Sequence, residues 1–205
     1  MKKNKIYHVA YPYFSPEDIE WITNKVPSIL NGRLSTGPYT KEFEDKFAKF
    51  IGTEYAVFLN SCTSALEIST SFLNLSNDDE VIVPAETFIA TGMAVTNNNG
   101  KVIFAEINED TFCLSLSEIK RLRTNKTKAI MLVHFGGYIS NDAIEIRDYC
   151  KKENIFLIED CAHAIGSKID NISCGNIGNV GCFSFFSTKT ITTGEGGMLT
   201  TNNKE

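Results

Sequence analysis

The chain has 205 residues, of which 42% are hydrophobic and 22% charged, and this is the composition of an ordinary soluble globular protein. Its formal net charge of −5 and the lack of a basic stripe argue against a nucleic-acid-binding surface. No stretch reaches the roughly 18 consecutive apolar residues of a membrane span, and no apolar run follows the basic N-terminal residues 1–5, so we expect a cytoplasmic protein.

Strand and helix signals alternate along the chain. The first helix begins with Ser15 as a cap and Pro16 in its first turn, followed by two acidic residues that favour the positive end of a helix. The expected helices span residues 15–30, 41–50, 63–73, 88–97, 117–123 and 142–153. The expected strands span residues 55–59, 80–83, 101–105, 128–133, 155–158, 183–186 and 198–201. The first of them is expected to be short and buried, and the last two to form a closing pair.

This alternation predicts an α/β fold with three α/β/α layers, in which a mostly parallel sheet carries helices on both faces. We expect one domain over residues 1–205. Residues 201–205 follow a strand directly and no closing element comes after them, so we expect a piece of a longer protein. In such sheets, ligands bind beyond the carboxyl ends of the strands.

Six cysteines occur in the chain, none of them in a C-x-x-C pair and several inside apolar runs. This usage predicts reduced thiols that serve as small core residues. Cys161, His163 and Cys174 form the alternative, a metal site, but their spacing matches no zinc pattern. We therefore expect no metal.

Lys189 lies between an aromatic strand and a glycine-rich turn, whereas most lysines are solvated surface charges. Burial there would lower the pKa of the amine and make it a usable nucleophile. Such an amine can react with carbonyl groups through Schiff-base chemistry, for which pyridoxal phosphate is the usual partner.

Asp160 follows the apolar run at residues 155–158, so its carboxylate is expected to be half buried. A buried carboxylate is costly without a partner, and a protonated pyridine nitrogen would be one. The alternative is a helix cap for the segment that follows.

Three further positions fall at strand ends. Residues 60–66 offer backbone amides and hydroxyls at a helix start, which suit a phosphate or simply cap the helix. Phe88 could stack on a flat cofactor or belong to the core. His163 could contact the phenolic oxygen of the cofactor or be structural.

Several motifs, in a defined order and spacing, lie between about Tyr11 and the end of the chain. These motifs are Gly37-Pro38 with Phe43-Glu44, Ser61-Cys62-Thr63-Ser64-Ala65-Leu66, Asp79-Glu80-Val81-Ile82-Val83-Pro84 with Thr87-Phe88, Val133-His134-Phe135-Gly136, Glu159-Asp160-Cys161-Ala162-His163-Ala164, and Phe183-Ser184-Phe185-Phe186 with Lys189 and Gly194-Glu195-Gly196-Gly197. Together they resemble the DegT/DnrJ/EryC1/StrS family of sugar aminotransferases, which have the fold of the type I pyridoxal phosphate-dependent transferases. The last motif is the most specific.

The resemblance implies a role for each matching position. Lys189 would bind pyridoxal phosphate covalently and move protons, Asp160 would pair with the ring nitrogen, and Phe88 would stack on the ring. His163, where the family often has glutamine, would contact the ring oxygen. The phosphate would be bound by Thr63, Ser64 and Ser184.

Two positions depart from the family pattern or have a less definite role. Cys62 stands in the phosphate loop where the family commonly has glycine, which predicts a tighter loop. Glu195 lies in the Gly-Glu-Gly-Gly turn, where the resemblance gives it no definite role.

The resemblance implies an aminotransferase that moves an amine, with glutamate as the expected donor, to a keto group of a nucleotide-linked deoxy-sugar, as a homodimer. The family is nearly twice this long, and its small C-terminal domain supplies substrate contacts. The first alternative is therefore a truncated remnant that folds or binds the cofactor without turnover. A branch that dehydrates sugars has histidine in place of Lys189, and a dehydrogenase would need a G-x-G-x-x-G turn that the first helices lack.

Overall fold

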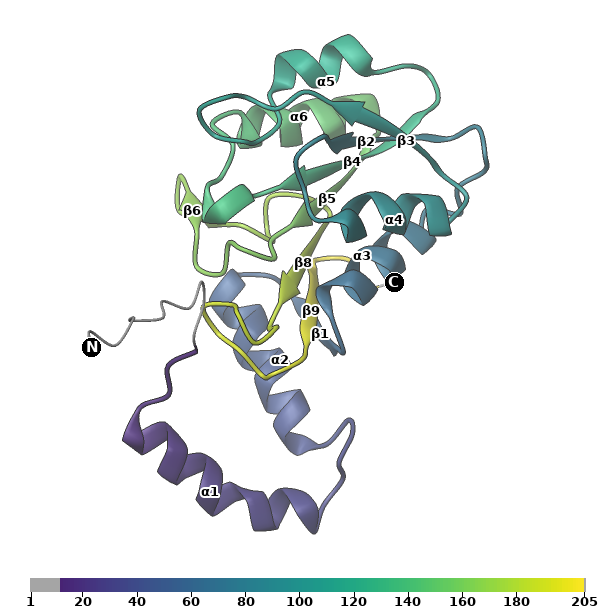
Figure 1. Ribbon diagram of the computed structural model, residues 1–205. Coiled ribbons are helices and arrows are strands. Elements are labelled where there is room, and N and C mark those ends of the chain that lie inside the picture. Colours follow the sequence, from purple (N-terminus) through teal and green to yellow (C-terminus); the bar gives the residue numbers. More distant parts are fainter. Residues whose placement is uncertain (1–11, 205) are drawn as a thin grey trace, which may run out of the picture.

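The computed structural model describes residues 12–204, so the basic N-terminal segment and Tyr11 lie outside the described residues. Its centre is a seven-stranded sheet, in the described part of the chain, with the strand order β1-β9-β8-β5-β4-β2-β3 (Figure 1). The strands of this sheet are β1 Tyr55–Leu59, β2 Glu80–Pro84, β3 Lys101–Ala105, β4 Thr127–Val133, β5 Phe156–Asp160, β8 Val180–Ser184 and β9 Gly197–Thr201.

Five of these strands run parallel to one another, from β3 through β2, β4 and β5 to β8. Only β9 pairs antiparallel with its neighbours, β8 and β1. The predicted mostly parallel sheet with a closing strand pair is therefore confirmed. Register places Val133 opposite Asp160, and Asp160 opposite Cys182, so the carboxyl ends of β4, β5 and β8 meet at one edge.

Helices cover both faces of the sheet, which confirms the three-layer fold. The helices are α1 Pro16–Leu30, α2 Pro38–Ile51, α3 Cys62–Ser71, α4 Ile89–Asn97, α5 Leu116–Leu122, α6 Ala143–Glu153 and the 3-10 turn η1 Phe135–Gly137. Buried residues of α2, α5 and α6 share one hydrophobic cluster, and those of α3 and α4 share another. No helix among residues 12–204 is long and apolar enough to cross a membrane.

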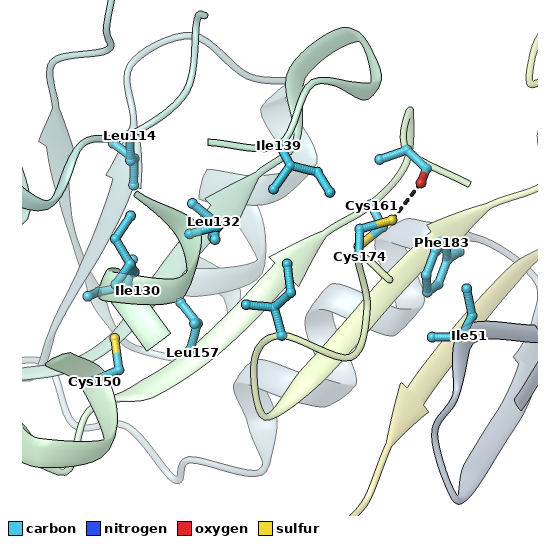
Figure 2. Close-up of a cluster of buried hydrophobic side chains, with 14 of the residues drawn as sticks. Ile51, Leu114, Ile130, Leu132, Ile139, Cys150, Leu157, Cys161, Cys174 and Phe183 are labelled. Atoms are coloured by element: carbon cyan, nitrogen blue, oxygen red, sulfur yellow. Dashed lines mark hydrogen bonds between the residues drawn. The ribbon is translucent and has the colours of Figure 1, made fainter. Parts of the chain in front are cut away.

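The cluster under α2 and α6 is the larger core (Figure 2). Ile130, Leu132 and Leu157 project from β4 and β5 with almost no exposed surface, as expected for parallel strands covered on both faces. The ring of Phe183 meets that of Phe47 edge-on, with 4.9 Å between centroids. All six cysteines are buried and free, which confirms the predicted use of reduced thiols as core residues.

The first helix forms as its sequence predicts. The Ser15 hydroxyl accepts a hydrogen bond from the Asp18 amide at 3.1 Å, and the Ser15 amide donates to the Asp18 carboxylate at 3.0 Å. This reciprocal pair is a capping box. None of the α1 side chains is buried, and the helix stands apart from the sheet (Figure 1).

Some sequence expectations were wrong in detail. The strand β1 is not buried, because it forms an edge of the sheet and leaves Val57 47% exposed. The strand β8 begins and ends earlier than the aromatic run suggested, since Val180 pairs with Ile158 of β5. A short hairpin, β6 Lys168–Ile169 and β7 Ile172–Ser173, was not predicted, because two-residue strands are too short to give a periodic signal.

Candidate active site at the carboxyl edge of the sheet

The carboxyl ends of β4, β5 and β8 and the starts of α3 and α4 surround a cavity of about 580 Å³. It is lined by most of the predicted site residues, namely Cys62, Thr63, Phe88, Asp160, His163, Ser184 and Lys189. Glu195 also lies on the wall. Ser64 does not, because its hydroxyl turns to the Asn60 side chain at 2.6 Å.

Asp160 ends β5 and leaves 5% of its surface exposed at the cavity. One carboxylate oxygen, Oδ2, accepts a hydrogen bond from the Thr91 hydroxyl at 2.8 Å, and Oδ1 accepts one from the Ala162 amide at 3.1 Å. The carboxylate thus caps a turn and not a helix, which corrects the capping alternative. Within residues 12–204 no side-chain cation forms an ion pair with it. A buried carboxylate in this position favours a cationic ligand group.

Lys189 lies in the turn after β8, where its amide donates to the Phe186 carbonyl at 2.9 Å. The side chain is half buried. Burial lowers the pKa of Lys189 below its usual 10.5, and the negative charge of Asp160 partly opposes that shift. The amine is therefore neutral, and hence nucleophilic, in a larger fraction than an exposed lysine at the same pH.

The start of α3 forms another wall of the cavity. Ser61 caps this helix by accepting a hydrogen bond from the Ser64 amide at 3.1 Å, so the capping interpretation holds for Ser61. Cys62 and Thr63 follow in the first turn and line the cavity. The partial positive charge of a helix start and its unpaired amides favour an anion there, and Ser184 adds a buried hydroxyl.

The Cys62 thiol faces the carboxylate side of the cavity. Its sulfur lies 4.0 Å from Asp160 Oδ1. Burial raises the pKa of Cys62 well above its usual value, and the neighbouring Asp160 charge raises it further. The group is therefore a protonated thiol at neutral pH, whose weak S–H donor is directed to Asp160.

Phe88 and His163 both line the cavity. Phe88 is 72% exposed at the N-terminal cap position of α4, so the core alternative for this ring is wrong. His163 Nδ1 accepts a hydrogen bond from the Gly136 amide at 3.4 Å. Burial lowers the pKa of His163, and the charge of Lys189 lowers it further, while Asp160 opposes both. In the neutral ring, Nε2 then carries the proton.

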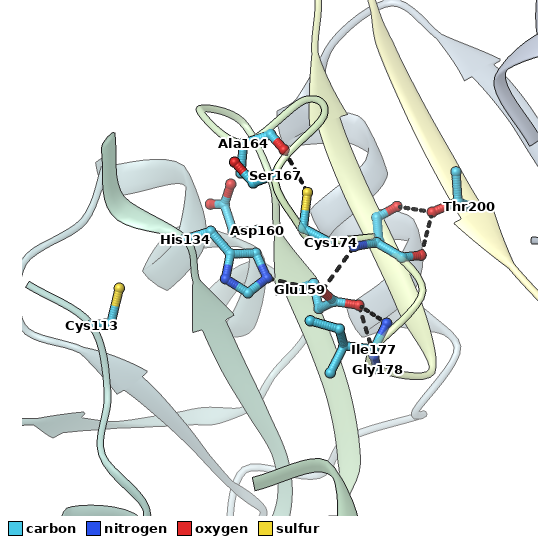
Figure 3. A network of polar contacts seen from close by, with 12 residues as sticks. Cys113, His134, Glu159, Asp160, Ala164, Ser167, Cys174, Ile177, Gly178 and Thr200 are labelled. Atoms are coloured by element: carbon cyan, nitrogen blue, oxygen red, sulfur yellow. Dashed lines mark hydrogen bonds and ion pairs between the residues drawn. The ribbon is translucent and has the colours of Figure 1, made fainter. Parts of the chain in front are cut away.

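A buried polar network adjoins the cavity at His134 and Asp160 (Figure 3). Glu159 and His134 are both fully buried, and His134 Nε2 lies 2.9 Å from Glu159 Oε2. The Glu159 carboxylate also accepts hydrogen bonds, at 2.7–2.8 Å, from the backbone amides of Gly175, Ile177 and Gly178. These bonds tie the loop before β8 to Glu159 of β5, the residue next to Asp160.

The same network holds the potential metal ligands of the described residues. His134, Glu159 and Cys161 place one ligand atom each within 4.8 Å of one another. The four hydrogen bonds at Glu159 already account for its carboxylate. The set considered from the sequence is not assembled, since Cys174 donates its S–H to the Ala164 carbonyl.

Sequence reasoning missed the residues that hold Asp160 in place. Thr87 and Thr91 are four positions apart at the start of α4, and Glu159 directly precedes Asp160. The available signal was weak. A threonine on the apolar face of a helix and a second acid at a strand end each need a polar partner when buried.

Known proteins are similar to this chain in sequence and in fold. A family model described as the DegT/DnrJ/EryC1/StrS aminotransferase family matches residues 16–205. GDP-perosamine synthase from Escherichia coli O157:H7 is 42% identical over 187 residues, which are 91% of this chain and 48% of that protein.

Two solved structures are similar over nearly the whole chain. An aminotransferase from Psychrobacter cryohalolentis superposes with a TM-score of 0.88 and 34% identity, over 95% of this chain and 49% of that one. The PLP form of a protein described as a sugar aminotransferase, Spr1654 from Streptococcus pneumoniae, gives a TM-score of 0.82 and 31% identity, over 95% and 53%. The chain therefore spans about half the length of the relatives it matches.

Proposed function

The chain belongs to the DegT/DnrJ/EryC1/StrS aminotransferase family, and from this premise we propose that it serves the transfer of an amino group to a keto group of a nucleotide-linked deoxy-sugar. The family depends on pyridoxal phosphate. The similarity to GDP-perosamine synthase supports a nucleotide-linked sugar as the acceptor. The single observation that carries the proposal is the cavity wall that Lys189 and Asp160 share.

The residues of the cavity fit pyridoxal phosphate. Its volume, about 580 Å³, is in the range of small-molecule sites. The buried Asp160 carboxylate suits a protonated ring nitrogen, and the start of α3 suits a phosphate. Lys189 supplies the amine for the covalent bond, and the exposed ring of Phe88 is free to stack. When bound, the cofactor supplies an electron sink for the substrate carbon next to the nitrogen.

The side chains would each contribute a distinct step. Lys189 Nζ would take a proton from the substrate carbon and return it, because burial lowers its pKa and so raises the fraction of the amine that is neutral and can accept a proton. Asp160 would keep the ring nitrogen protonated. His163 would donate from Nε2 to the ring oxygen, since Nδ1 is taken by the Gly136 amide.

A smaller cavity adjoins the first at Lys189. It holds about 300 Å³ and shares Ala162, His163, Thr188 and Lys189 with the first. Lys189 therefore lines two spaces, of which the larger would hold the cofactor and the smaller would admit a substrate. Glutamate as donor, a homodimer as the assembly and the cytoplasm as the location complete the proposal.

The proposal is tested by adding pyridoxal phosphate to the purified protein, reducing with borohydride and mapping the labelled peptide by mass spectrometry. We expect one stable adduct on Lys189. Glutamate and a nucleotide-linked keto-sugar are then supplied to the unreduced protein, and amino-sugar formation is followed by chromatography.

The outcomes separate the two functions that the sequence left open. An adduct on Lys189 with amine transfer supports the aminotransferase. An adduct without transfer supports the alternative, a chain that binds the cofactor without turnover, for which the half-length match to relatives is the motivating observation. Failure to form any adduct would overturn both.

A further inference from the structure

A chain of two hydroxyls leads from the cavity rim to Asp160. The Thr91 hydroxyl lies 2.8 Å from Asp160 Oδ2 and 2.8 Å from the Thr87 hydroxyl. Thr91 is fully buried on α4, and Thr87 immediately precedes Phe88 on the cavity wall. Two elements remote in sequence, β5 and the start of α4, are thus joined by one polar contact.

The direction of these hydrogen bonds follows from the chemistry of the groups. An ionised carboxylate only accepts, and a threonine hydroxyl has a single proton to donate. Thr91 therefore donates to Asp160, and its own oxygen accepts the proton of Thr87. A bond from a hydroxyl to a charged acceptor is among the stronger kinds in proteins.

Two buried hydroxyls on the neighbouring helix α3 donate within their own helix. Ser69 donates to the Ala65 carbonyl at 2.7 Å, and Thr70 donates to the Leu66 carbonyl at 2.8 Å, each four residues back. Thr91, in the first turn of α4, donates across to Asp160 of β5. The Thr91 hydroxyl therefore links α4 to the Asp160 carboxylate of β5.

We propose that Thr91, oriented by Thr87, is a positioning residue that fixes the Asp160 carboxylate toward the ring nitrogen of the cofactor. Thr91 holds Oδ2 and the Ala162 amide holds Oδ1, so the plane of the carboxylate is set before a ligand enters. This inference rests on the proposed function. Since Thr87 precedes Phe88, the same turn would set both the ring that stacks and the acid that pairs.

The test uses the variant Thr91→Val, which keeps the shape of the side chain and removes the hydroxyl. We expect the dissociation constant for pyridoxal phosphate to rise at least about tenfold, the size of a lost hydrogen bond to a charged group. The pH at which the absorbance of the bound cofactor titrates should shift as well. Thr91→Ser should restore both values to within about twofold of the wild type.

A matched control and a second variant keep the test decisive. Thr96→Val changes an exposed threonine on the same helix, whose hydroxyl donates to the Met93 carbonyl, and should leave both values unchanged. Thr87→Val should raise the dissociation constant less than Thr91→Val does. Adding it to Thr91→Val should have no further effect, because the chain is already broken.

The failure of this inference differs from the failure of the proposed function. A wild type that forms no borohydride-stable adduct would overturn the function itself. A wild-type adduct together with an unchanged dissociation constant in folded Thr91→Val would overturn the role of Thr91 alone. If Thr91→Val does not fold, Thr87→Val decides, and wild-type affinity and titration in that variant would overturn the proposal.

Discussion

Lys189 and Asp160 reach one cavity from two neighbouring parallel strands. Asp160 ends β5 and lies opposite Cys182 of β8, and Lys189 follows in the turn beyond β8. The Asp160 carboxylate is near enough to raise the pKa of Lys189 against the lowering effect of burial. An amine and an acid that are distant in sequence thus act within a single electrostatic environment.

The first prediction concerns Lys189→Ala. Because the amine is the expected covalent partner of the cofactor, this variant should form no borohydride-stable adduct and show no amine transfer. The fold should persist and still hold pyridoxal phosphate non-covalently through Asp160 and the start of α3. Equilibrium dialysis with absorbance detection measures the binding, and mass spectrometry measures the adduct.

Lys152→Ala is the matched control, since Lys152 is an exposed lysine of α6 far along the chain from the turn. It should label like the wild type. Adduct formation or turnover in Lys189→Ala would show that another amine carries the chemistry.

The sequence predicted most of the fold because local signals agreed with the final packing. The capping box at Ser15 favours a helix start, and the apolar runs favour buried strands. The sequence did not predict the exposure of the edge strand β1 or the short hairpin β6–β7. Whether β1 is buried depends on its being an edge strand, and the hairpin β6–β7 turns at Asp170 and Asn171 with positive φ angles.

The position of a candidate residue was predictable where residue type and strand end coincide, as at Asp160. The direction of a side chain was harder to foresee. Ser64 turns to Asn60 because its hydroxyl completes the cap, and Cys62 faces Asp160 across the cavity. The role of Thr91 depends on a contact between α4 and β5, which only the sheet order creates.

The second prediction is a pH dependence of stability carried by His163. Its pKa is lowered in the folded protein, so between that pKa and about 6.5 the unfolded chain binds more protons than the folded one. Stability should therefore rise with pH through this window and fall on acidification. His163→Gln should lose less stability than the wild type between about pH 7 and about pH 5, as measured by urea midpoints.

Comparing the wild type with His163→Gln isolates His163, because the rest of the sequence is the same in both. His163→Gln also restores the residue that the family often has, so cofactor binding should survive. Equal slopes for the two proteins would contradict the assigned environment of His163.

The third prediction is that Glu159→Gln destabilises the protein. The carboxylate accepts hydrogen bonds from three backbone amides and faces His134 in a fully buried site. In the glutamine variant, the amide nitrogen would place its own N–H groups against some of the backbone N–H groups that now donate to Glu159. The free energy of unfolding should therefore fall by about 2–4 kcal/mol. Urea denaturation measures the loss. Glu145→Gln, an exposed position of α6, should stay within about 0.5 kcal/mol of the wild type.

The fourth prediction concerns the thiols. All six are buried, and burial raises the pKa of Cys150 to about 12, so the reactive thiolate is scarce in the folded state. Labelling by Ellman's reagent should be on the order of 10³ times slower in the native protein than in urea. Unfolding should then release all six thiols per chain. Fast labelling of the native protein, or fewer thiols in urea, would contradict the reduced, buried assignment.

The last prediction concerns Gly197, the first residue of β9, which pairs with Leu59 on one side and Ser184 on the other. A Cβ there would overlap the Ser61 carbonyl group and the Cys62 amide, both of them backbone. Backbone cannot move aside as a flexible side chain can, so Gly197→Ala must displace either β9 or the start of α3. We expect a loss of about 3 kcal/mol in the free energy of unfolding.

The same substitution should weaken the binding of pyridoxal phosphate, because the displaced helix start is the proposed phosphate site. Gly92→Ala is the control, since nothing lies within 4 Å of its added Cβ in the described structure and alanine favours a helix. It should stabilise the protein by up to about 1 kcal/mol and leave binding unchanged. Wild-type stability and affinity in Gly197→Ala would show that β9 and α3 do not approach as closely as the overlap requires.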